Sequence, residues 1–174
     1  KPVFIQPKLD GVRCLIQYDS GVVTAYSRTG KVWKNIEHIN INLYKFFDKH
    51  PNVVLDGELY NHDFRDDFEQ IISMVRKTKP TDEARAKSAE NVQFHCYDIV
   101  NRKMKFSTRD EWLKGNLQSN HCIKLVNTWM VNEEQAREMH KANLKNGYEG
   151  SIVRLDTPYQ CKRSHSLRKF KDFS

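Results

Sequence analysis

Residues 8–13 read KLDGVR and place a lysine, an aspartate, a glycine and an arginine within six positions, at the start of an apolar segment. Lys8 has three candidate roles: a salt-bridge partner, a clamp for a phosphate, or a nucleophile. A nucleophilic amine must be neutral, so desolvation, neighbouring cations or a metal would have to lower the ordinary lysine pKa of about 10.4. Asp10 and Gly11 permit a sharp turn that presents Lys8 to a ligand. The alternative interpretation of this run is an ordinary turn.

Outward from this run, alternating apolar residues predict strands and helically spaced apolar residues predict helices. The expected strands cover residues 3–5, 12–18, 22–26, 52–60, 92–100, 122–129, 149–155 and 166–170. The expected helices cover residues 36–47, 64–75 and 107–117, with a fourth between Asn132 and Gly147. Residues 76–90 are polar and charged, and we expect an exposed, mobile insertion there. These elements predict an α+β fold of mainly antiparallel strands with helices packed on them.

Two of the expected helices carry a start signal. Asn132 followed by Gln135 is a capping-box pattern, and Gly147 is placed to end that helix. Ser107 followed by Asp110 resembles the same pattern and predicts that a helix begins there.

Composition limits the class of protein. A chain of 174 residues that is 39% hydrophobic fits one globular domain with a real core. No apolar run approaches the ~18 residues of a membrane span, and residues 1–6 are too soon polar for a signal peptide. The four cysteines are scattered without a Cys-x-x-Cys pair, which disfavours a zinc cluster or a disulfide framework. We therefore expect a reducing cytoplasmic compartment, the host cytoplasm if the protein is viral, with the nucleus not excluded.

The net charge is +7, and much of the basic excess lies near the two ends of the sequence. If the ends fold against each other, they form one basic face suited to a polyanion. A solvated basic surface is the alternative.

Carboxylates interrupt two apolar strands. Asp56-Gly57-Glu58 lies between apolar residues, and Glu149-Gly150 precedes the run SIV. Charges inside such strands are costly unless they have a partner or a metal. Taken singly, Glu58 and Glu149 are each better explained as a turn or strand-end carboxylate. Taken together with Lys8, the pair favours a site that holds Mg²⁺ with phosphate oxygens.

Residues 94–98 and 167–171 carry further candidates. Alternation puts Phe94, Cys96 and Asp98 on one strand face, with His95 and Tyr97 on the other. Tyr97 could stack on a purine or be a core aromatic, and His95 is a weaker candidate for a general base. The same alternation puts Lys169 and Lys171 on one face, where they suit a triphosphate or a polynucleotide, or protect a sheet edge.

In this order, the segments resemble the nucleotidyltransferase (adenylation) domain of ATP-dependent DNA ligases, in the superfamily that includes mRNA capping enzymes. Residues 8–13 resemble motif I, and residues 27–30 (SRTG) resemble the arginine-bearing segment after it. Four further segments resemble family motifs: residues 55–58 motif III, residues 94–99 motif IIIa, residues 149–154 motif IV and residues 167–171 motif V. The resemblance implies an ATP-grasp-like nucleotidyltransferase fold of antiparallel sheets with flanking helices. The compact size is most similar to viral or phage enzymes.

The resemblance also implies roles. Lys8 would attack the α-phosphate of ATP and hold AMP as a phosphoramidate, with Mg²⁺ (or Mn²⁺) as the metal. Tyr97 would stack on adenine, and Arg28 would grip the 5′-phosphate at a nick. The implied residues are Gln6, Arg13, Arg28, Glu58, Tyr97, Lys169 and Lys171 for ATP or AMP, Glu58 and Glu149 for the metal, and Arg28, Arg154 and Arg163 for nucleic acid.

More specifically, Arg13 would contact the ribose or a phosphate, Glu58 the ribose or the metal, and Lys169 and Lys171 the α-phosphate. Two residues depart from the family pattern. Gln6 stands where many DNA ligases have an adenine-contacting glutamate, and Arg168 takes a usually apolar place.

In the family, an OB-fold domain with motif VI follows motif V. We expect residues 1–174 to be the adenylation domain without this C-terminal domain, so that self-adenylation is slow and nick sealing is poor.

The leading hypothesis is the catalytic core of an ATP-dependent DNA ligase, a monomer whose partners are ATP and nicked duplex DNA and which binds no membrane. An RNA ligase or a GTP-dependent capping guanylyltransferase is the alternative within the superfamily. Against capping, Glu149-Gly150 replaces the Asp-Gly typical of motif IV there, and residues 167–171 lack the usual Trp-Lys-Pro ending. A basic nucleic-acid-binding module without chemistry is an alternative from another class.

Overall fold

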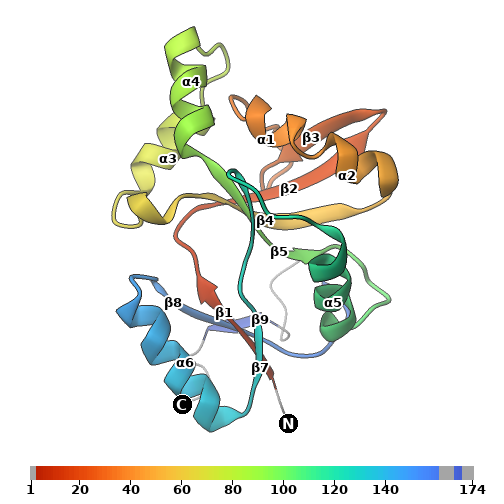
Figure 1. The fold of residues 1–174 in the computed structure, drawn as a ribbon, viewed down its shortest axis with the longest axis vertical. Coiled ribbons are helices and arrows are strands. Elements are labelled where there is room, and N and C mark those ends of the chain that lie inside the picture. The colour runs from red at the N-terminus through yellow and green to blue at the C-terminus, as the bar shows by residue number, and fades with distance from the viewer. Residues whose placement is uncertain (1–2, 161–166, 170–174) are drawn as a thin grey trace.

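Two β-sheets, joined by the chain between β1 and β2 and flanked by helices, make up the fold (Figure 1). The computed structural model describes residues 3–160 and 167–169, the last three by their backbone alone. Within these residues, every helix is too short or too polar to cross a lipid bilayer.

The larger sheet has the strand order β3-β2-β4-β5-β6. Its strands are β2 (Val12–Asp19), β3 (Val22–Tyr26), β4 (Val54–Tyr60), β5 (Gln93–Ile99) and β6 (Ile123–Leu125). All neighbours are antiparallel except β5 and β6, which are parallel. The register between β4 and β5 shifts between Asp56 and Gly57, which face Asp98 and Cys96, so Tyr97 is an extra residue on β5.

The smaller sheet has the order β7-β1-β8-β9, with all neighbours antiparallel. Its strands are β1 (Val3–Lys8), β7 (Trp129–Val131), β8 (Gly150–Arg154) and β9 (Leu167–Lys169). Lys8 pairs with Gly150, so the ends of two motifs that are far apart in the sequence become neighbours. The strands nearest to the two ends of the described sequence, β1 and β9, also share this sheet, which is the condition set above for a single basic face.

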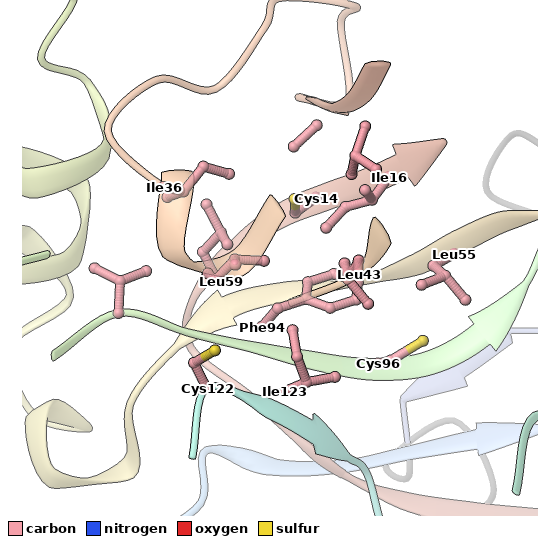
Figure 2. Close-up of a cluster of buried hydrophobic side chains, with 14 of the residues drawn as sticks. Cys14, Ile16, Ile36, Leu43, Leu55, Leu59, Phe94, Cys96, Cys122 and Ile123 are labelled. Atoms are coloured by element: carbon pink, nitrogen blue, oxygen red, sulfur yellow. The ribbon is translucent and has the colours of Figure 1, made fainter. Parts of the chain in front are cut away.

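Helices cover the outer faces. They are α1 (Glu37–Ile41), α2 (Tyr44–Lys49), α3 (Phe68–Val75), α4 (Asp82–Asn91), α5 (Phe106–Asn116) and α6 (Glu133–Lys145), with a 3₁₀ turn η1 (His62–Phe64). The main core lies between α1, α2 and the larger sheet, where Ile36, Leu43 and Phe94 meet (Figure 2). Each such fully buried side chain contributes roughly 1.5–3 kcal/mol. A smaller core packs α6 against Ile5 and Val153 of the smaller sheet.

Several expected elements are divided in the structure. The helix expected at 36–47 is two short helices, because the Asn42 side chain donates to the His38 carbonyl (2.6 Å) and the chain turns at Leu43. The helix expected at 64–75 begins only at Phe68, after η1. The strand expected at 122–129 is β6 and β7, which belong to different sheets because the chain crosses from one sheet to the other between them.

The insertion expected at 76–90 is instead largely the helix α4. Thr81 caps it by accepting a hydrogen bond from the Ala84 N–H (3.1 Å), and acidic residues occupy its first turn. The helix is exposed, as expected, apart from Ser88, whose hydroxyl donates to the Asn35 carbonyl. Contacts made by Asn35 therefore anchor a helix that has almost no apolar face of its own.

The two predicted helix starts had different outcomes. The capping box of Asn132 and Gln135 is present, with both hydrogen bonds formed. The capping box predicted at Ser107 is wrong, because α5 begins at Phe106 and the Asp156 carboxylate accepts from the Ser107 N–H (2.8 Å) and hydroxyl (3.0 Å). A distant residue thus satisfies this helix end, which a local pattern cannot reveal.

Candidate active site

Lys8 stands at the end of β1, on the face turned toward the larger sheet. Its Nζ donates to Glu149 Oε1 at 2.6 Å, and the two side chains are 25% and 44% exposed. The pair forms because Lys8 is in register with Gly150 across β1 and β8. Two residues that sequence analysis treated separately, the predicted nucleophile and a predicted metal ligand, are therefore in direct contact.

The three residues after Lys8 carry the chain from one sheet to the other. The Gly11 N–H donates to Glu58 Oε2 at 3.0 Å, which ties this crossing to β4. Burial raises the pKa of the half-buried Glu58 carboxyl to about 8, against the opposing effects of the Gly11 N–H and Arg13. Burial, helped by the charge of Glu149, also raises the pKa of Asp10. Glu58 is thus largely neutral at pH 7 and can donate a hydrogen bond.

Arg13 forms a bidentate pair with Asp56. Its Nε and Nη2 donate to the two carboxylate oxygens at 2.6 and 2.9 Å, and Asp56 is only 1% exposed. The Tyr159 hydroxyl completes the group by donating to Asp56 Oδ2 (2.8 Å). The pair fixes the plane of the guanidinium at the larger sheet, and its contact with a ribose or a phosphate stays a prediction.

Asp98 is the centre of a buried charge network that sequence analysis did not identify. This fully buried carboxylate accepts from Arg109 Nε (2.8 Å) and Nη2 (3.2 Å), and from Arg154 Nη1 (3.2 Å). Arg154 is 9% exposed and was expected to contact nucleic acid. The structure corrects that expectation, because Asp98 holds this guanidinium in the interior, where a buried charge needs a partner.

Gln6 extends this network between the two sheets. Its Oε1 accepts from Arg154 Nε (2.7 Å), and its Nε2 donates to the Tyr97 carbonyl (3.1 Å) and to Thr128 Oγ1 (2.9 Å). Both ends of the amide are therefore bonded within the protein, and the residue is 2% exposed. This geometry argues against the adenine contact expected for Gln6, whose amide instead links β1 to β5.

Phe94 and Cys96 face the main core, as alternation predicted. The prediction that Asp98 shares their face is wrong, because the bulge at Tyr97 turns Asp98 toward Arg154, which also covers the Tyr97 ring. The Arg154 guanidinium sits over the Tyr97 ring, 5.1 Å from the centroid, so one ring face is already covered. Stacking of adenine on Tyr97 stays a prediction. Burial lowers the pKa of His95 to about 4, and its Nε2 bonds Gln93 Oε1 (2.9 Å), which favours a structural role over a general base.

Arg28 and Lys169, among the remaining predicted basic residues, lie toward the sheet edges. Arg28 is exposed in a turn closed by hydrogen bonds from Ser27 to Lys31 and from Gly30 to Ser27. The backbone of Lys169 pairs with Ile152, one strand away from Lys8. Arg163 and Lys171 lie outside the described residues, so their predicted contacts stay predictions.

The comparisons with known proteins bear directly on this arrangement. The model of the ATP dependent DNA ligase domain family matches residues 1–171. The chain belongs to this family. It is 30% identical over 170 residues to DNA ligases of two African swine fever virus isolates, Tick/South Africa/Pretoriuskop Pr4/1996 and Warthog/Namibia/Wart80/1980. These matches cover 90% of the chain but only 37% of each viral ligase, so the chain spans little more than a third of these relatives.

Solved structures confirm the expected fold of this ligase domain. The ATP-dependent DNA ligase of bacteriophage T7, in complex with ATP, superposes with a TM-score of 0.74 at 16% identity, covering 97% of this chain and 61% of that one. Chlorella virus DNA ligase-adenylate gives a TM-score of 0.72 at 20% identity, covering 97% and 60%. At these identities, the likeness shows a shared nucleotidyltransferase fold.

A shallow cavity of about 210 Å³ opens beside the Lys8–Glu149 pair of the ligase domain. It is lined by Asp10, Tyr60, Arg65, Asp66, Gly147, Tyr148 and Glu149. Among the residues that the structure describes, no three His, Cys, Asp or Glu side chains are grouped to hold a metal. Mg²⁺ usually needs only one or two carboxylates besides substrate phosphates and water, and the exposed Glu149 fits that pattern. Glu58 fits it less well, because its carboxyl is largely neutral at pH 7.

Sequence reasoning missed Arg109, Tyr159 and the surroundings of Tyr148. The sequence carried one signal for Arg109, because Asp98 inside an apolar strand requires a buried cation as its partner. Nothing in the sequence indicates which arginine of the ligase domain supplies it.

Proposed function

We propose that the chain is the catalytic core of an ATP-dependent DNA ligase that uses Lys8 as its nucleophile. The observation that carries the proposal is the position of Lys8 Nζ, 2.6 Å from Glu149 at the junction of the two sheets, in a chain whose family is the ATP-dependent DNA ligase domain.

In the first step, the Lys8 ammonium loses a proton, for which the Glu149 carboxylate is an acceptor within hydrogen-bond distance. The freed electron pair attacks the α-phosphorus of ATP. A nitrogen–phosphorus bond forms as the bond to the bridging oxygen breaks, and pyrophosphate leaves with that electron pair.

Two further transfers would seal a nick. An oxygen of the 5′-phosphate attacks the α-phosphorus of the adduct, the nitrogen–phosphorus bond breaks, and Lys8 recovers a proton. The 3′-hydroxyl then attacks the activated 5′-phosphate, loses its proton, and displaces AMP. The duplex is left with a new phosphodiester bond.

We assign the binding roles to the residues that frame Lys8. Tyr97 stacks on adenine through the ring face that Arg154 does not cover, and the neutral Glu58 carboxyl donates to a ribose hydroxyl. Mg²⁺ (or Mn²⁺), held through Glu149, would offset the negative charge of the triphosphate when bound. The cationic contacts proposed for ATP and the nick are those of Arg13, Arg28, Lys169 and Lys171.

We further propose that residues 1–174 act as the adenylation domain and that an OB-fold domain completes the enzyme. The match to only 37% of each viral relative supports a larger whole protein. The complete enzyme would act as a monomer on nicked duplex DNA, in the cytoplasm of a host cell.

The proposal is tested by incubating the protein with Mg²⁺ and α-labelled ATP or GTP and then denaturing it. We expect label from ATP to stay on the protein and to be lost in Lys8→Ala, but kept in the surface control Lys145→Ala. Label from GTP alone would indicate a capping enzyme. A protein that takes no label from either nucleotide would contradict the proposal and favour a binding module. Transfer of labelled AMP to nicked DNA, compared with nicks that contain RNA, identifies the polynucleotide.

A further inference from the structure

A group of four residues joins the two sheets beside the Lys8–Glu149 pair. The ring of His62, in η1 just after β4, stacks on Tyr148, in the loop before β8, with centroids 4.2 Å apart and planes 27° apart. Tyr60 and Asn146 hold the histidine in place. We call Tyr60, His62, Asn146 and Tyr148 the His62 latch. One segment follows β4 of the larger sheet and the other precedes β8 of the smaller sheet, and the contact between His62 and Asn146 joins them.

Both nitrogens of the His62 ring are hydrogen-bonded. Nε2 lies 2.8 Å from the Asn146 carbonyl, and Nδ1 lies 2.6 Å from the Tyr60 hydroxyl. A carbonyl only accepts, so Nε2 carries the hydrogen and the Tyr60 hydroxyl donates to Nδ1. These two hydrogen bonds fix the tautomer and the orientation of the ring. One joins it to Tyr60 at the end of β4, and the other joins it to Asn146 at the end of α6.

The turn that carries Tyr148 is closely fitted to η1. Gly147 has φ +88°, and a Cβ there would lie 2.5 Å from Arg65 Nε, so a side chain would strain the backbone and displace Arg65. Arg65 Nη1 donates to the His62 carbonyl (2.9 Å), and the Tyr148 N–H donates to the Asn143 carbonyl (3.0 Å). Tyr148 is therefore held from both sides, by η1 and by the end of α6.

Glu149 follows Tyr148 directly, and it reaches Lys8 from this turn. The Lys8–Glu149 ion pair is partly exposed, and such pairs contribute too little to hold a loop by themselves. We propose that His62 is a positioning residue, which through Tyr148 fixes Glu149 opposite Lys8. The inference rests on the proposed roles of Lys8 and Glu149, and it adds a residue from η1, just after β4, that sets their geometry.

The test measures the reactivity of Lys8 without any nucleotide. The intact chain is treated with a limiting amine-acetylating reagent, and mass spectrometry compares acetylation of Lys8 with that of exposed Lys145 in the same sample. Loss of Glu149 from its position leaves the Lys8 amine without its ion-pair partner and more accessible to the reagent. We expect His62→Ala to raise the relative acetylation rate of Lys8 about two- to fivefold, the range for an exposed ion pair, toward the rate of Glu149→Gln.

Two further variants separate positioning from general loosening. His62→Phe keeps an aromatic ring against Tyr148, so its Lys8 acetylation rate should lie between those of the wild type and His62→Ala. His50 is a comparable histidine elsewhere in the fold, where it packs on Trp112 with ring centroids 5.0 Å apart. His50→Ala should leave the acetylation rate of Lys8 unchanged. Thermal denaturation checks that each variant is folded. If His62→Ala is not folded, the comparison is made with His62→Phe, which must then exceed the wild-type rate.

An unchanged Lys8 rate in folded His62→Ala would overturn the inference, and so would an equal rise in His50→Ala. Because no ATP is present, the result is independent of adduct formation. A protein that fails to adenylate but shows the His62 effect would refute the proposed function alone.

Discussion

Replacing Glu58 by glutamine should make the stability of the protein less sensitive to pH. The Glu58 carboxyl is half-buried, and burial raises its pKa from 4.5 to about 8. Between these two values, the folded protein keeps a proton that the unfolded chain has released. The free energy of unfolding contributed by Glu58 therefore falls as pH rises from 4.5 to 8 and is constant above that. Glutamine keeps the shape and can still accept from the Gly11 N–H, but it does not titrate.

The size of the effect follows from the pKa difference. The full shift between 4.5 and about 8 corresponds to about 5 kcal/mol. Because water can still reach a half-buried carboxylate and recover part of its hydration, we expect about 2 kcal/mol. Glu58→Gln should thus match the wild type near pH 5 and be more stable than the wild type by about 2 kcal/mol at pH 9.

Urea denaturation at pH 5, 7 and 9 measures this difference. Other groups that titrate in this range are common to both proteins and cancel in the comparison. Glu133→Gln, at a glutamate whose side chain is 70% exposed, serves as the control and should differ from the wild type by less than about 0.5 kcal/mol at each pH. Parallel stability curves for Glu58→Gln and the wild type would refute the raised pKa, and with it the neutral carboxyl proposed to bind the ribose.

Two further substitutions test the packing that positions the site. Asp98→Ala leaves two buried arginines without their partner and should cost about 3–5 kcal/mol in urea denaturation, and a loss below about 1 kcal/mol would contradict the buried network. Gly57→Ala places a Cβ 2.2 Å from the His95 carbonyl oxygen and should cost about 3 kcal/mol, whereas Gly115→Ala, with no atom within 4 Å of its Cβ, should gain about 0.5–1 kcal/mol in the helix α5. Similar thermal midpoints for the two alanine variants would mean that a Cβ at position 57 fits without a clash, contrary to this prediction.

Local patterns were reliable wherever neighbouring residues decide the outcome. The capping box at Asn132 formed as predicted, because it depends on residues within a few positions. Alternation placed Phe94 and Cys96 on the core face of β5 but misplaced Asp98, because pairing with β4 introduces a bulge at Tyr97. The helix α4 was missed although Thr81 signals its start, because its polar surface lacks the periodicity that identifies helices. The start of α5 was misplaced because its cap is Asp156, which only the fold brings near.

The sequence by itself determined the family and the order of the chemical groups along the chain, since these depend on which residue types follow one another. Tertiary structure alone decided which groups are partners. Lys8 meets Glu149 because β1 pairs with β8, and Asp98 takes Arg154 away from the surface because the two sheets pack against each other. Such pairings depend on strand register and on burying charge only beside an opposite charge, and both are properties of the assembled core.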